Sequence, residues 1–345
     1  MQRGSSPRPI IKYITTSTDG VNWIKIGDMP HFGRIVTSTE EKITREGAKK
    51  SRLVKKGDLI LSNSMSYGLP YIMGVDGYIH DGWFVLKDFE DTFDKDYLCN
   101  LLISSAIQNQ YKRLAAGGVV QNISSDLVNS VSVSIPLMEE QKKISSLLNL
   151  IDDRIATQNK IIDKLQSLIK GIAQNIVRNN KPNVRLSECL ECKSSTLQES
   201  DVCEQGTYPV YGANGIVGYL DNYNTEGEVV YIIKDGSGVG TVSYVKGKCS
   251  ATGTLNILQA KEGYSLQYLY YLLKVFNFEP YKTGMAIPHI YFKDYGKAKV
   301  YCPSYTEQLQ YARLLSAIDN KLSAAQHILT KLSLQKQYLL RQMFI

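Results

Sequence analysis

Long apolar runs are missing from this 345-residue sequence. No stretch approaches the roughly 18 consecutive apolar residues that a membrane-spanning helix needs. The opening residues, Met1 to Pro7, contain no apolar core and do not form a secretory signal peptide. We therefore expect a cytoplasmic protein without membrane contact, long enough for two globular domains that each bury a core.

Cysteine is scarce, with six scattered residues, five of them in the second half of the chain. Because no secretory signal is present, we expect reduced thiols. Only Cys189 and Cys192 have a spacing found in metal sites, and no second cysteine pair or histidine pair lies at a suitable distance. We therefore predict no metal ion. We expect a half-buried helix that carries both cysteines as small residues, and a zinc site is the alternative.

Motifs that would make this chain an enzyme are also missing. The sequence has no adjacent proline pair, so it lacks the Asn/Asp-Pro-Pro-aromatic tetrad that holds a flipped adenine in amino-methyltransferases. It has no Gly-x-x-x-x-Gly-Lys-Ser/Thr loop for a nucleotide-driven motor. Residues Gly236 to Gly240 resemble a cofactor-binding glycine loop, but a lone Gly-x-Gly-x-Gly is weak evidence. We predict no catalytic residue and no cofactor in this chain, with a methyltransferase as the alternative among enzymes.

Charge and aromatic content favour a recognition protein. The formal net charge is +7, an excess that suits a polyanion partner without requiring one. Tyrosine is abundant, with 23 residues against 8 Phe and 2 Trp. A tyrosine side chain offers a rigid ring and a hydroxyl group, and both suit a polar recognition surface.

One long internal repeat organises the sequence. A proline followed by Glu140-Gln141 recurs as a proline followed by Glu307-Gln308, 167 residues later, and the same offset relates Ile151-Asp152 to Ile318-Asp319. Farther upstream the offset changes to 170 and then 171. Insertions are tolerated in loops between elements, so this drift is expected. We infer a tandem duplication of a globular part followed by a long helix.

Apolar residues recur with a 4-3 spacing from Glu140 to Arg178, a stretch without proline. This spacing predicts a long helix with a coiled-coil seam rather than a helix that lies on a globule. Each helix of about 39 residues would be about 58 Å long. The first seam comprises Ile144, Leu148, Ile151, Ile155, Gln158, Ile162, Leu165, Ile169, Ile172 and Ile176. The second comprises Leu315, Ile318, Leu322, Ala325, Leu329, Leu332 and Leu339, with Lys336 in one seam position.

Neither helix can bury its seam alone, because isolated helices are held mainly by packing. We expect the two helices to pair antiparallel, which would bring Gln158 level with Ala325. A polar residue beside a small one would fix the register or admit water there. Pairing between two copies of the chain in a homodimer is the alternative. Pro182 prevents the first helix from continuing.

Short strands and turns fill the sequence before each long helix. Turn-and-strand segments begin at Gly57 and Gly227, and helices are expected at 96–114 and 265–276. Further short strands are expected at 71–75, 83–86, 241–245 and 255–258. Mixed strands with few helices favour an α+β fold. We expect two tandem α/β domains with curled mixed sheets, separated by two long helices that form an antiparallel coiled coil.

Polar residues concentrate in the loops between these strands. Small hydroxyl and amide side chains on glycine-containing loops suit close approach to a phosphodiester backbone, and Asn and Gln can pair with adenine. A surface turn that only needs glycine is the alternative for any one residue. The predicted DNA-binding residues are Ser62, Asn63, Ser64, Ser66, Tyr67, Lys112, Arg113, Gln121 and Asn122 in the first copy, and Lys234, Asp235, Ser237, Lys282, Thr283, His289 and Tyr291 in the second.

The doubled arrangement of a glycine loop, a strand, a proline, Glu-Gln and a heptad helix resembles the specificity subunit of type I restriction-modification enzymes. Residues 208–216, followed by 235–240, are similar to one subtype of that family's target-recognition domain, which adds Tyr211 and Asn214 to the predicted DNA-binding residues. The resemblance covers nearly the whole chain. It implies that each globular domain reads one half of a bipartite site in double-stranded DNA.

The same resemblance implies partners. In that family the paired helices set the spacing of the two half-sites and bind two methyltransferase subunits, which methylate adenine with S-adenosylmethionine. A restriction subunit can join them. A coiled-coil scaffold protein that does not bind DNA is the alternative function, which the modest net charge would fit.

The repeat and the resemblance together give the expected segments. Target-recognition domain 1 spans 1–136, the first spacer helix 137–181, target-recognition domain 2 182–303, and the second spacer helix 304–345. The second copy opens with Val184 to Glu191, for which the first copy has no counterpart, because the first copy starts about level with Lys193 at Arg3.

Overall fold

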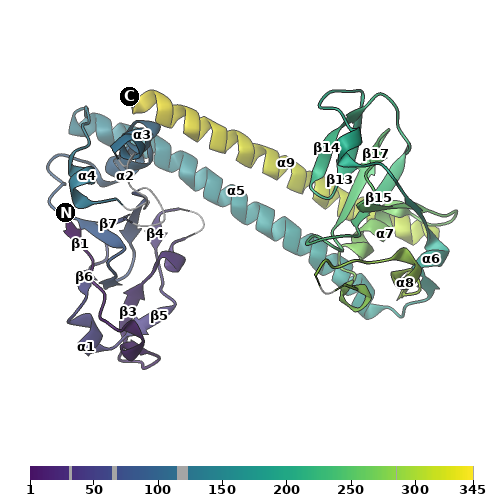
Figure 1. Cartoon of the computed structure of the whole chain (residues 1–345), viewed down its shortest axis with the longest axis horizontal. Coiled ribbons are helices and arrows are strands. Elements are labelled where there is room, and N and C mark those ends of the chain that lie inside the picture. The colour runs from purple at the N-terminus through teal and green to yellow at the C-terminus, as the bar shows by residue number, and fades with distance from the viewer. Residues whose placement is uncertain (31–32, 64–67, 115–122, 285, 345) are drawn as a thin grey trace. The chain divides into compact units, whose positions relative to one another are not determined.

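The computed structural model describes residues 1–30, 33–63, 68–114, 123–284 and 286–344. The chain divides into two compact units, residues 1–160 with 327–345, and residues 161–326. Each unit contains one globular domain and parts of two long helices, α5 (Met138–Asn179) and α9 (Tyr305–Met343) (Figure 1). Each long helix thus contributes one half to each unit.

The first unit contains two mixed sheets. Its strands are β1 (Gln2–Arg3), β2 (Ile14–Thr15), β3 (Val21–Ile24), β4 (Ile35–Val36), β5 (Glu41–Ile43), β6 (Arg52–Val54), β7 (Leu59–Ser62), β8 (Pro70–Met73), β9 (Gly77–Ile79) and β10 (Trp83–Leu86). One sheet has the order β1-β10-β7-β8-β4, with β4 parallel to β8. The other has the order β2-β5-β3-β9-β6, with β3 parallel to β9. The remaining neighbours are antiparallel.

The helices of the first domain are α1 (Arg45–Ala48), α2 (Lys95–Ile103), α3 (Ser105–Leu114) and α4 (Ser125–Asn129), besides two 3₁₀ turns at Ile10–Lys12 and Ile26–Asp28. The single helix expected at 96–114 is therefore two helices. Ser104 separates them with an extended backbone, and its hydroxyl oxygen accepts the N–H of Ile107 at 3.4 Å. Serine at this position caps the start of the second helix, which a spacing of apolar residues does not reveal.

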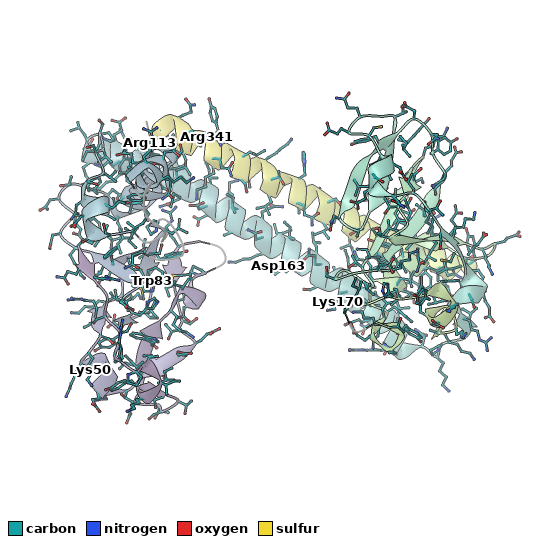
Figure 2. The ribbon with its side chains drawn as sticks, in the orientation of Figure 1. Lys50, Trp83, Arg113, Asp163, Lys170 and Arg341 are labelled. Carbon is teal, nitrogen blue, oxygen red and sulfur yellow. The ribbon has the colours of Figure 1, made fainter. Side chains whose placement is uncertain are left out.

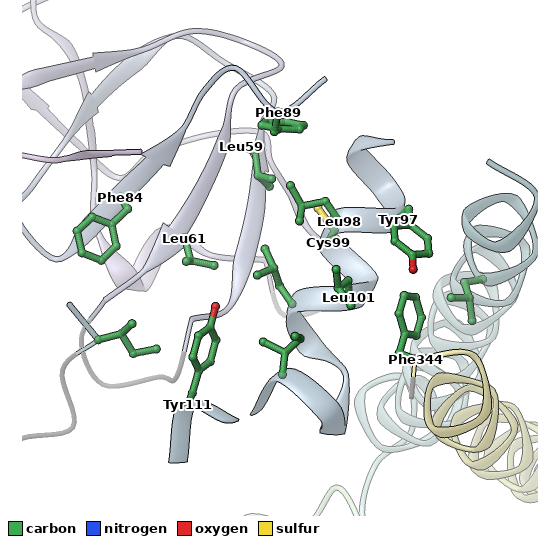
Figure 3. Close-up of a cluster of buried hydrophobic side chains, with 14 residues drawn as sticks. Leu59, Leu61, Phe84, Phe89, Tyr97, Leu98, Cys99, Leu101, Tyr111 and Phe344 are labelled. Atoms are coloured by element: carbon green, nitrogen blue, oxygen red, sulfur yellow. The ribbon is translucent and has the colours of Figure 1, made fainter. Parts of the chain in front are cut away.

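The main core of the first unit lies between the β7 sheet, α2 and α3, and the ends of the long helices. Leu59, Leu98 and Leu148 belong to one buried cluster, and Leu148 comes from α5. Figure 3 shows the rings of Tyr97 and Phe344 facing each other, with centroids 5.1 Å apart. The start of α5 and the end of α9 thus pack on this domain.

The second unit has the same plan, but its second sheet differs. We call the sheets β2-β5-β3-β9-β6 and β14-β13-β17 the outer sheets of the two domains. Its elements are β11 (Val184–Arg185), α6 (Leu186–Cys189), β12 (Leu190–Ser194), β13 (Tyr208–Gly212), β14 (Gly215–Leu220), β15 (Glu228–Ile233), β16 (Val242–Lys246), β17 (Ser250–Ala251), β18 (Leu255–Ala260), α7 (Leu266–Leu273), α8 (Phe292–Tyr295) and β19 (Lys299–Val300), with 3₁₀ turns at Glu199–Asp201 and Glu279–Tyr281. The strand orders are β12-β18-β15-β16, β14-β13-β17 and β11-β19, and β13 is parallel to β17. The expected strands at 71–75, 83–86, 241–245 and 255–258 correspond to β8, β10, β16 and β18.

The two sheets that carry β7 and β15 share four strands in the same order, β1-β10-β7-β8 and β12-β18-β15-β16, and the first sheet adds β4. β1 pairs with β10 as β12 pairs with β18. Gly82 and Thr254 accept the N–H groups of the equivalent residues Asn63 and Lys234, so Phe84, two residues after Gly82, corresponds to Asn256. Arg3 lies opposite Phe84 and Ser194 lies opposite Asn256, so Arg3 is level with Ser194, the residue after the expected Lys193.

Within each unit the two long helices run antiparallel, as expected. Near the start of α5, Ile144 and Leu148 share a cluster with Leu339 near the end of α9. In the second unit, Ile169 of α5 lines the same hollow as Leu322 of α9. All seventeen predicted seam residues are buried or half-buried. Gln158 and Ala325 belong to different units, so their level pairing stays a prediction. No helix among the described residues is long and apolar enough to span a membrane.

Candidate nucleic-acid interface

Two predicted loops of the second unit meet directly. The N–H of Ile290 donates to the carbonyl of Lys234 at 2.9 Å, and the N–H of Gly236 donates to the carbonyl of Pro288 at 3.0 Å. The side chains add a contact of 2.6 Å between Nδ1 of His289 and Oδ1 of Asp235. Gly236 has a φ of +91°, which L side chains rarely adopt. This glycine therefore serves the turn that brings the loops together. It corresponds to the alternative interpretation, a surface turn that only needs glycine.

The other predicted residues of these loops surround the Asp235–His289 pair. Thr283 and His289 exchange both backbone hydrogen bonds, at 2.9 and 2.7 Å. Lys282 is half-buried and bonded to Glu279 at 2.6 Å, whereas Ser237 is exposed. Tyr291 is 47% exposed, so a large aromatic surface is open to a ligand. The result is a polar surface with hydroxyl, imidazole and carboxylate groups fixed by backbone pairing.

Tyr211 and Asn214 lie at the hairpin of β13 and β14, beside the same loops. The carbonyl of Tyr211 accepts the N–H of Thr252 at 2.8 Å, and two residues on, the carbonyl of Thr254 accepts the N–H of Lys234 at 3.0 Å. Asn214 is exposed in the turn, and Tyr211 is half-buried. Burial raises the pKa of Tyr211, so its hydroxyl remains a neutral donor. The structure thus joins the loops that carry Lys234, Asp235, Thr283 and His289, and it links the strand of Tyr211 to them through Thr252 and Thr254.

In the first unit, Ser62 and Asn63 differ from the expectation of an open polar loop. Both are buried, with 1% and 3% exposed. The hydroxyl oxygen of Ser62 accepts the N–H of Leu69 at 2.9 Å, and the amide of Asn63 donates to the carbonyl of Asp81 at 2.8 Å. Both side chains therefore close the end of β7 inside the domain, because buried polar groups need internal partners.

The remaining predictions for the first copy divide in two. Lys112 and Arg113 are exposed on the last turn of α3, where Figure 2 labels Arg113. Five predicted residues lie outside the described part of the chain: Ser64, Ser66, Tyr67, Gln121 and Asn122. The described residues that border these segments are joined as in the second unit, since the N–H of Ile123 donates to the carbonyl of Asn63 at 2.8 Å.

The glutamine of the repeated Glu-Gln pair fixes each long helix to its domain, a role that the repeat alone did not reveal. Gln141 is 1% exposed and Gln308 is 2% exposed. The amide oxygen of Gln141 accepts the N–H of Asp94, and that of Gln308 accepts the N–H of Ser265, both at 2.9 Å. Asp94 and Ser265 cap α2 and α7, so the helix that follows each sheet is tied to the start of the long helix.

Lys336 occupies a seam position because it neutralises a half-buried carboxylate. Asp152 of α5 binds Arg34 at 3.0 Å and also forms an ion pair with Lys336 at 2.5 Å. At the equivalent position of the second unit, Asp319 accepts the hydroxyl of Tyr271 at 3.4 Å, and Ile169 stands in place of the lysine. The second unit holds no such ion triad among its described residues.

The two cysteines with metal-like spacing lie on different elements. Cys189 ends α6 and is buried, whereas Cys192 lies in β12. The Sγ atom of Cys189 is 3.9 Å from that of Cys302. In the part of the chain that the structure describes, no three His, Cys, Asp or Glu side chains are grouped to hold a metal. The prediction that one helix carries both cysteines is therefore wrong for Cys192, which lies in a strand.

A family model described as type I restriction modification DNA specificity domain matches residues 8–167 and, a second time, residues 180–334. The chain belongs to this family. Two matches in tandem agree with the duplication seen in the sequence and in the sheets. The family is one of DNA specificity, which agrees with the expectation that this chain is not itself an enzyme.

Individual relatives point to the same family. The specificity subunit of the type I restriction enzyme EcoprrI from Escherichia coli is 21% identical over 92% of this chain and 85% of its own length. A putative type I specificity subunit from Mycoplasma genitalium is 25% identical over 69% of this chain and 68% of its own. Among solved structures, the crystal structure of a type I restriction-modification S subunit from M. genitalium has a TM-score of 0.63 at 17% identity, covering 99% of this chain and 96% of that one. This likeness shows the shared fold.

Proposed function

We propose that each globular domain of this type I specificity protein reads one half of a bipartite site in double-stranded DNA. The observation that carries this proposal is a loop frame, a backbone hydrogen bond between two polar loops, that occurs once in each copy. Asn63 and Lys234 accept the N–H groups of Ile123 and Ile290, so both copies join the same two loops in the same way. The side chains on the two frames differ, which suits two half-sites of different sequence.

The paired helices would set the distance between the half-sites. A helix of 42 residues, the length of α5, extends about 63 Å. One turn of DNA is about 34 Å, so such a helix exceeds the separation of sites one turn apart. The spacing then depends on the number of helical residues between the two domains, and not on the loops.

Two similar partner subunits would dock on two equivalent hollows, one inside each unit. The hollow of the first unit has a volume of about 350 Å³ and that of the second about 450 Å³. Every residue lining the first, except Gly33, has its counterpart in the second at an offset of 167 or 171: Ile103 and Lys274, Asp152 and Asp319, Ile155 and Leu322, Ala156 and Ser323, Ser333 and Gln166, Lys336 and Ile169, Gln337 and Lys170, Leu340 and Ala173.

We infer that these partners are adenine methyltransferase subunits that use S-adenosylmethionine, and that a restriction subunit can join the complex in the cytoplasm. The family membership and the two equivalent hollows support this assignment. Lys170, labelled in Figure 2, and Gln337 are exposed and equivalent, so Lys170→Glu and Gln337→Glu form a matched pair. Native mass spectrometry should show one partner subunit lost with either change and two with both. Two bound subunits in the double variant would contradict docking at these hollows.

The DNA-reading proposal is tested with the methyltransferase partner present, by selection from a pool of randomised duplexes. We expect two short recognised sequences separated by a fixed number of unspecified base pairs. Binding should also weaken steeply with salt, because phosphate contacts release counterions. Equal affinity for every duplex in the pool would contradict a specificity function and favour a scaffold that does not read DNA.

A further inference from the structure

A hollow of about 570 Å³ opens on the first domain beside the predicted DNA loops. None of the residues predicted from the sequence lines it. Its walls include Arg8, Trp23, Lys25, Glu41, His80 and Asp81. Its rim is continuous with the loop that follows β7, because Asn63 is bonded to the carbonyls of both Asp81 and Gly82, at 2.8 and 3.0 Å.

Strand register relates His80 to a residue of the second domain that is bonded to Tyr211. In each outer sheet one pair of strands is parallel: β3 with β9, and β13 with β17. Ile24 lies opposite Ile79, and Tyr211 lies opposite Ala251. The residue after Ile79 is His80, so His80 corresponds to Thr252.

The backbone confirms this equivalence two residues farther on. Gly82 accepts the N–H of Asn63 at 3.0 Å, and Thr254 accepts the N–H of Lys234 at 3.0 Å. Asn63 and Lys234 are themselves the equivalent loop residues that bind Ile123 and Ile290. The hollow is therefore lined, in the first domain, by the counterpart of Thr252, the residue whose N–H binds the carbonyl of Tyr211 in the second domain.

His80 presents a hydrogen-bond donor of fixed identity in this hollow. The backbone N–H of Gly82 donates to its Nδ1 at 2.8 Å. A backbone N–H cannot accept, so Nδ1 is the acceptor and the neutral ring carries its proton on Nε2. In the described part of the chain no group is bonded to Nε2. The ring is held by Trp23 and Trp83, with centroids 6.1 and 6.2 Å away.

The neutral state of this ring follows from its surroundings. Burial lowers the pKa of His80, and the nearby carboxylates of Asp81 and Asp28 oppose that effect only in part. The carboxylate of Asp81 lies 3.9 Å from Nδ1 and is bonded instead to Ser6 at 2.7 Å and Arg8 at 3.2 Å. The proton on Nε2 is therefore the one that a ligand meets.

The charges around the hollow favour a base edge over a phosphate group. Each cation that lines it already has a carboxylate partner: Lys25 binds Glu41 at 2.7 Å, and Arg8 binds Asp81 at 3.2 Å. A phosphate would have to compete with these carboxylates, whereas a neutral acceptor would not. A neutral N–H donor in a fixed position matches the acceptor atoms on the major-groove edges of purines and thymine.

We propose that His80 determines specificity at one base pair of the half-site read by the first domain, by donating its Nε2–H to an acceptor on the base edge. This inference rests on the proposed function, since it needs the first domain to read DNA. It adds His80 to the first copy, where Ser62 and Asn63 are buried.

Two substitutions separate the reading role of the ring from its structural role. His80→Asn places a carbonyl oxygen where Nδ1 accepts from Gly82, but it removes the donor at Nε2. His80→Gln keeps a donor near the Nε2 position and gives up the Gly82 acceptor. Both variants are studied as the full chain with its methyltransferase partner, by selection from duplexes randomised at both half-sites, with urea unfolding to verify that each variant folds.

We expect His80→Asn to weaken discrimination at one base pair of one half-site by about 3- to 10-fold, the loss of one hydrogen bond. His80→Gln should keep most of that discrimination, and the other half-site should be read unchanged by both. Unaltered base preference in a folded His80→Asn protein, with both half-sites still read, would overturn the role of His80 alone. If the unsubstituted chain shows no sequence preference at all, the proposed function itself is overturned.

Discussion

Gln141 accepts the backbone N–H of Asp94, the residue that caps α2, at 2.9 Å. Its amide nitrogen donates to the carbonyls of Thr92 and Pro136, both at 3.0 Å. One buried side chain thus satisfies three backbone groups from two segments. Gln308 repeats two of these contacts, to Ser265, which caps α7, and to Pro303, which precedes α9. The Glu-Gln pair is therefore a joint between domain and helix, with the glutamine as its buried member.

We predict that Gln141→Ala lowers the free energy of unfolding by about 2–3 kcal/mol, because three backbone groups lose their partner in a buried place. Urea unfolding measures the change. Glu140→Ala is the matched control, since the Glu140 side chain is exposed and its loss should cost no more than about 0.5 kcal/mol. Equal losses for the two substitutions would show that the glutamine is not the joint.

Asp152 gives a second stability prediction. Its carboxylate holds two cations, Arg34 and Lys336, whose side chains are 14% and 18% exposed. Asp152→Asn leaves both cations without a carboxylate, so we expect a loss of about 2–4 kcal/mol in the free energy of unfolding. The counterpart Asp319→Asn gives up only a 3.4 Å contact with Tyr271, and its loss should stay below about 1 kcal/mol. A larger effect at Asp319 than at Asp152 would contradict this account of Lys336 in the seam.

The Asp235–His289 contact allows a test of the second reading surface. We expect His289→Ala to weaken binding to the preferred duplex by about 5- to 10-fold, because the contact that aligns the two loops is lost. A double-mutant cycle with Asp235→Asn, followed by fluorescence anisotropy, measures the coupling between the two side chains. The first half-site should be read as before. Strictly additive losses, with no coupling, would show that the pair does not act as one unit.

The low pKa of His80 predicts a specific pH dependence of stability. The unfolded chain binds the proton with the ordinary pKa near 6.5, and the folded domain binds it more weakly. Stability from this group is therefore complete above about pH 6.5 and falls as the pH drops below that value, by up to about 1.4 kcal/mol per pH unit. Between pH 7 and pH 5, the free energy of unfolding should fall more steeply for the unsubstituted chain than for His80→Asn. Identical slopes would contradict a neutral, half-buried His80.

Much of the architecture could be predicted because it follows from periodicity and repetition. The seam from Ile144 to Ile176 requires only an apolar residue at regular positions, and one offset transfers it to α9. The break at Ser104 could not be predicted in this way, because a single capping hydroxyl interrupts an apolar pattern that itself continues.

The candidate site was harder to predict than the fold. Asp235 and His289 lie 54 residues apart, yet both stand on glycine-containing polar loops, so composition pointed to them. Ser62 and Asn63 have the same composition, but in the structure they are buried and bond the backbone, since a polar residue at a strand end serves either purpose. His80 had no sequence signal, because its role depends on the tautomer that the N–H of Gly82 imposes.

The central claim is that the two domains read DNA independently while the helices hold them at a set spacing. The most direct test replaces residues 184–300 with the same segment of a relative and maps methylated adenines in cells that carry the partner methyltransferase. We predict that one half-site changes and that the other half-site and the spacer length do not. A change in both half-sites, or in neither, would contradict the account.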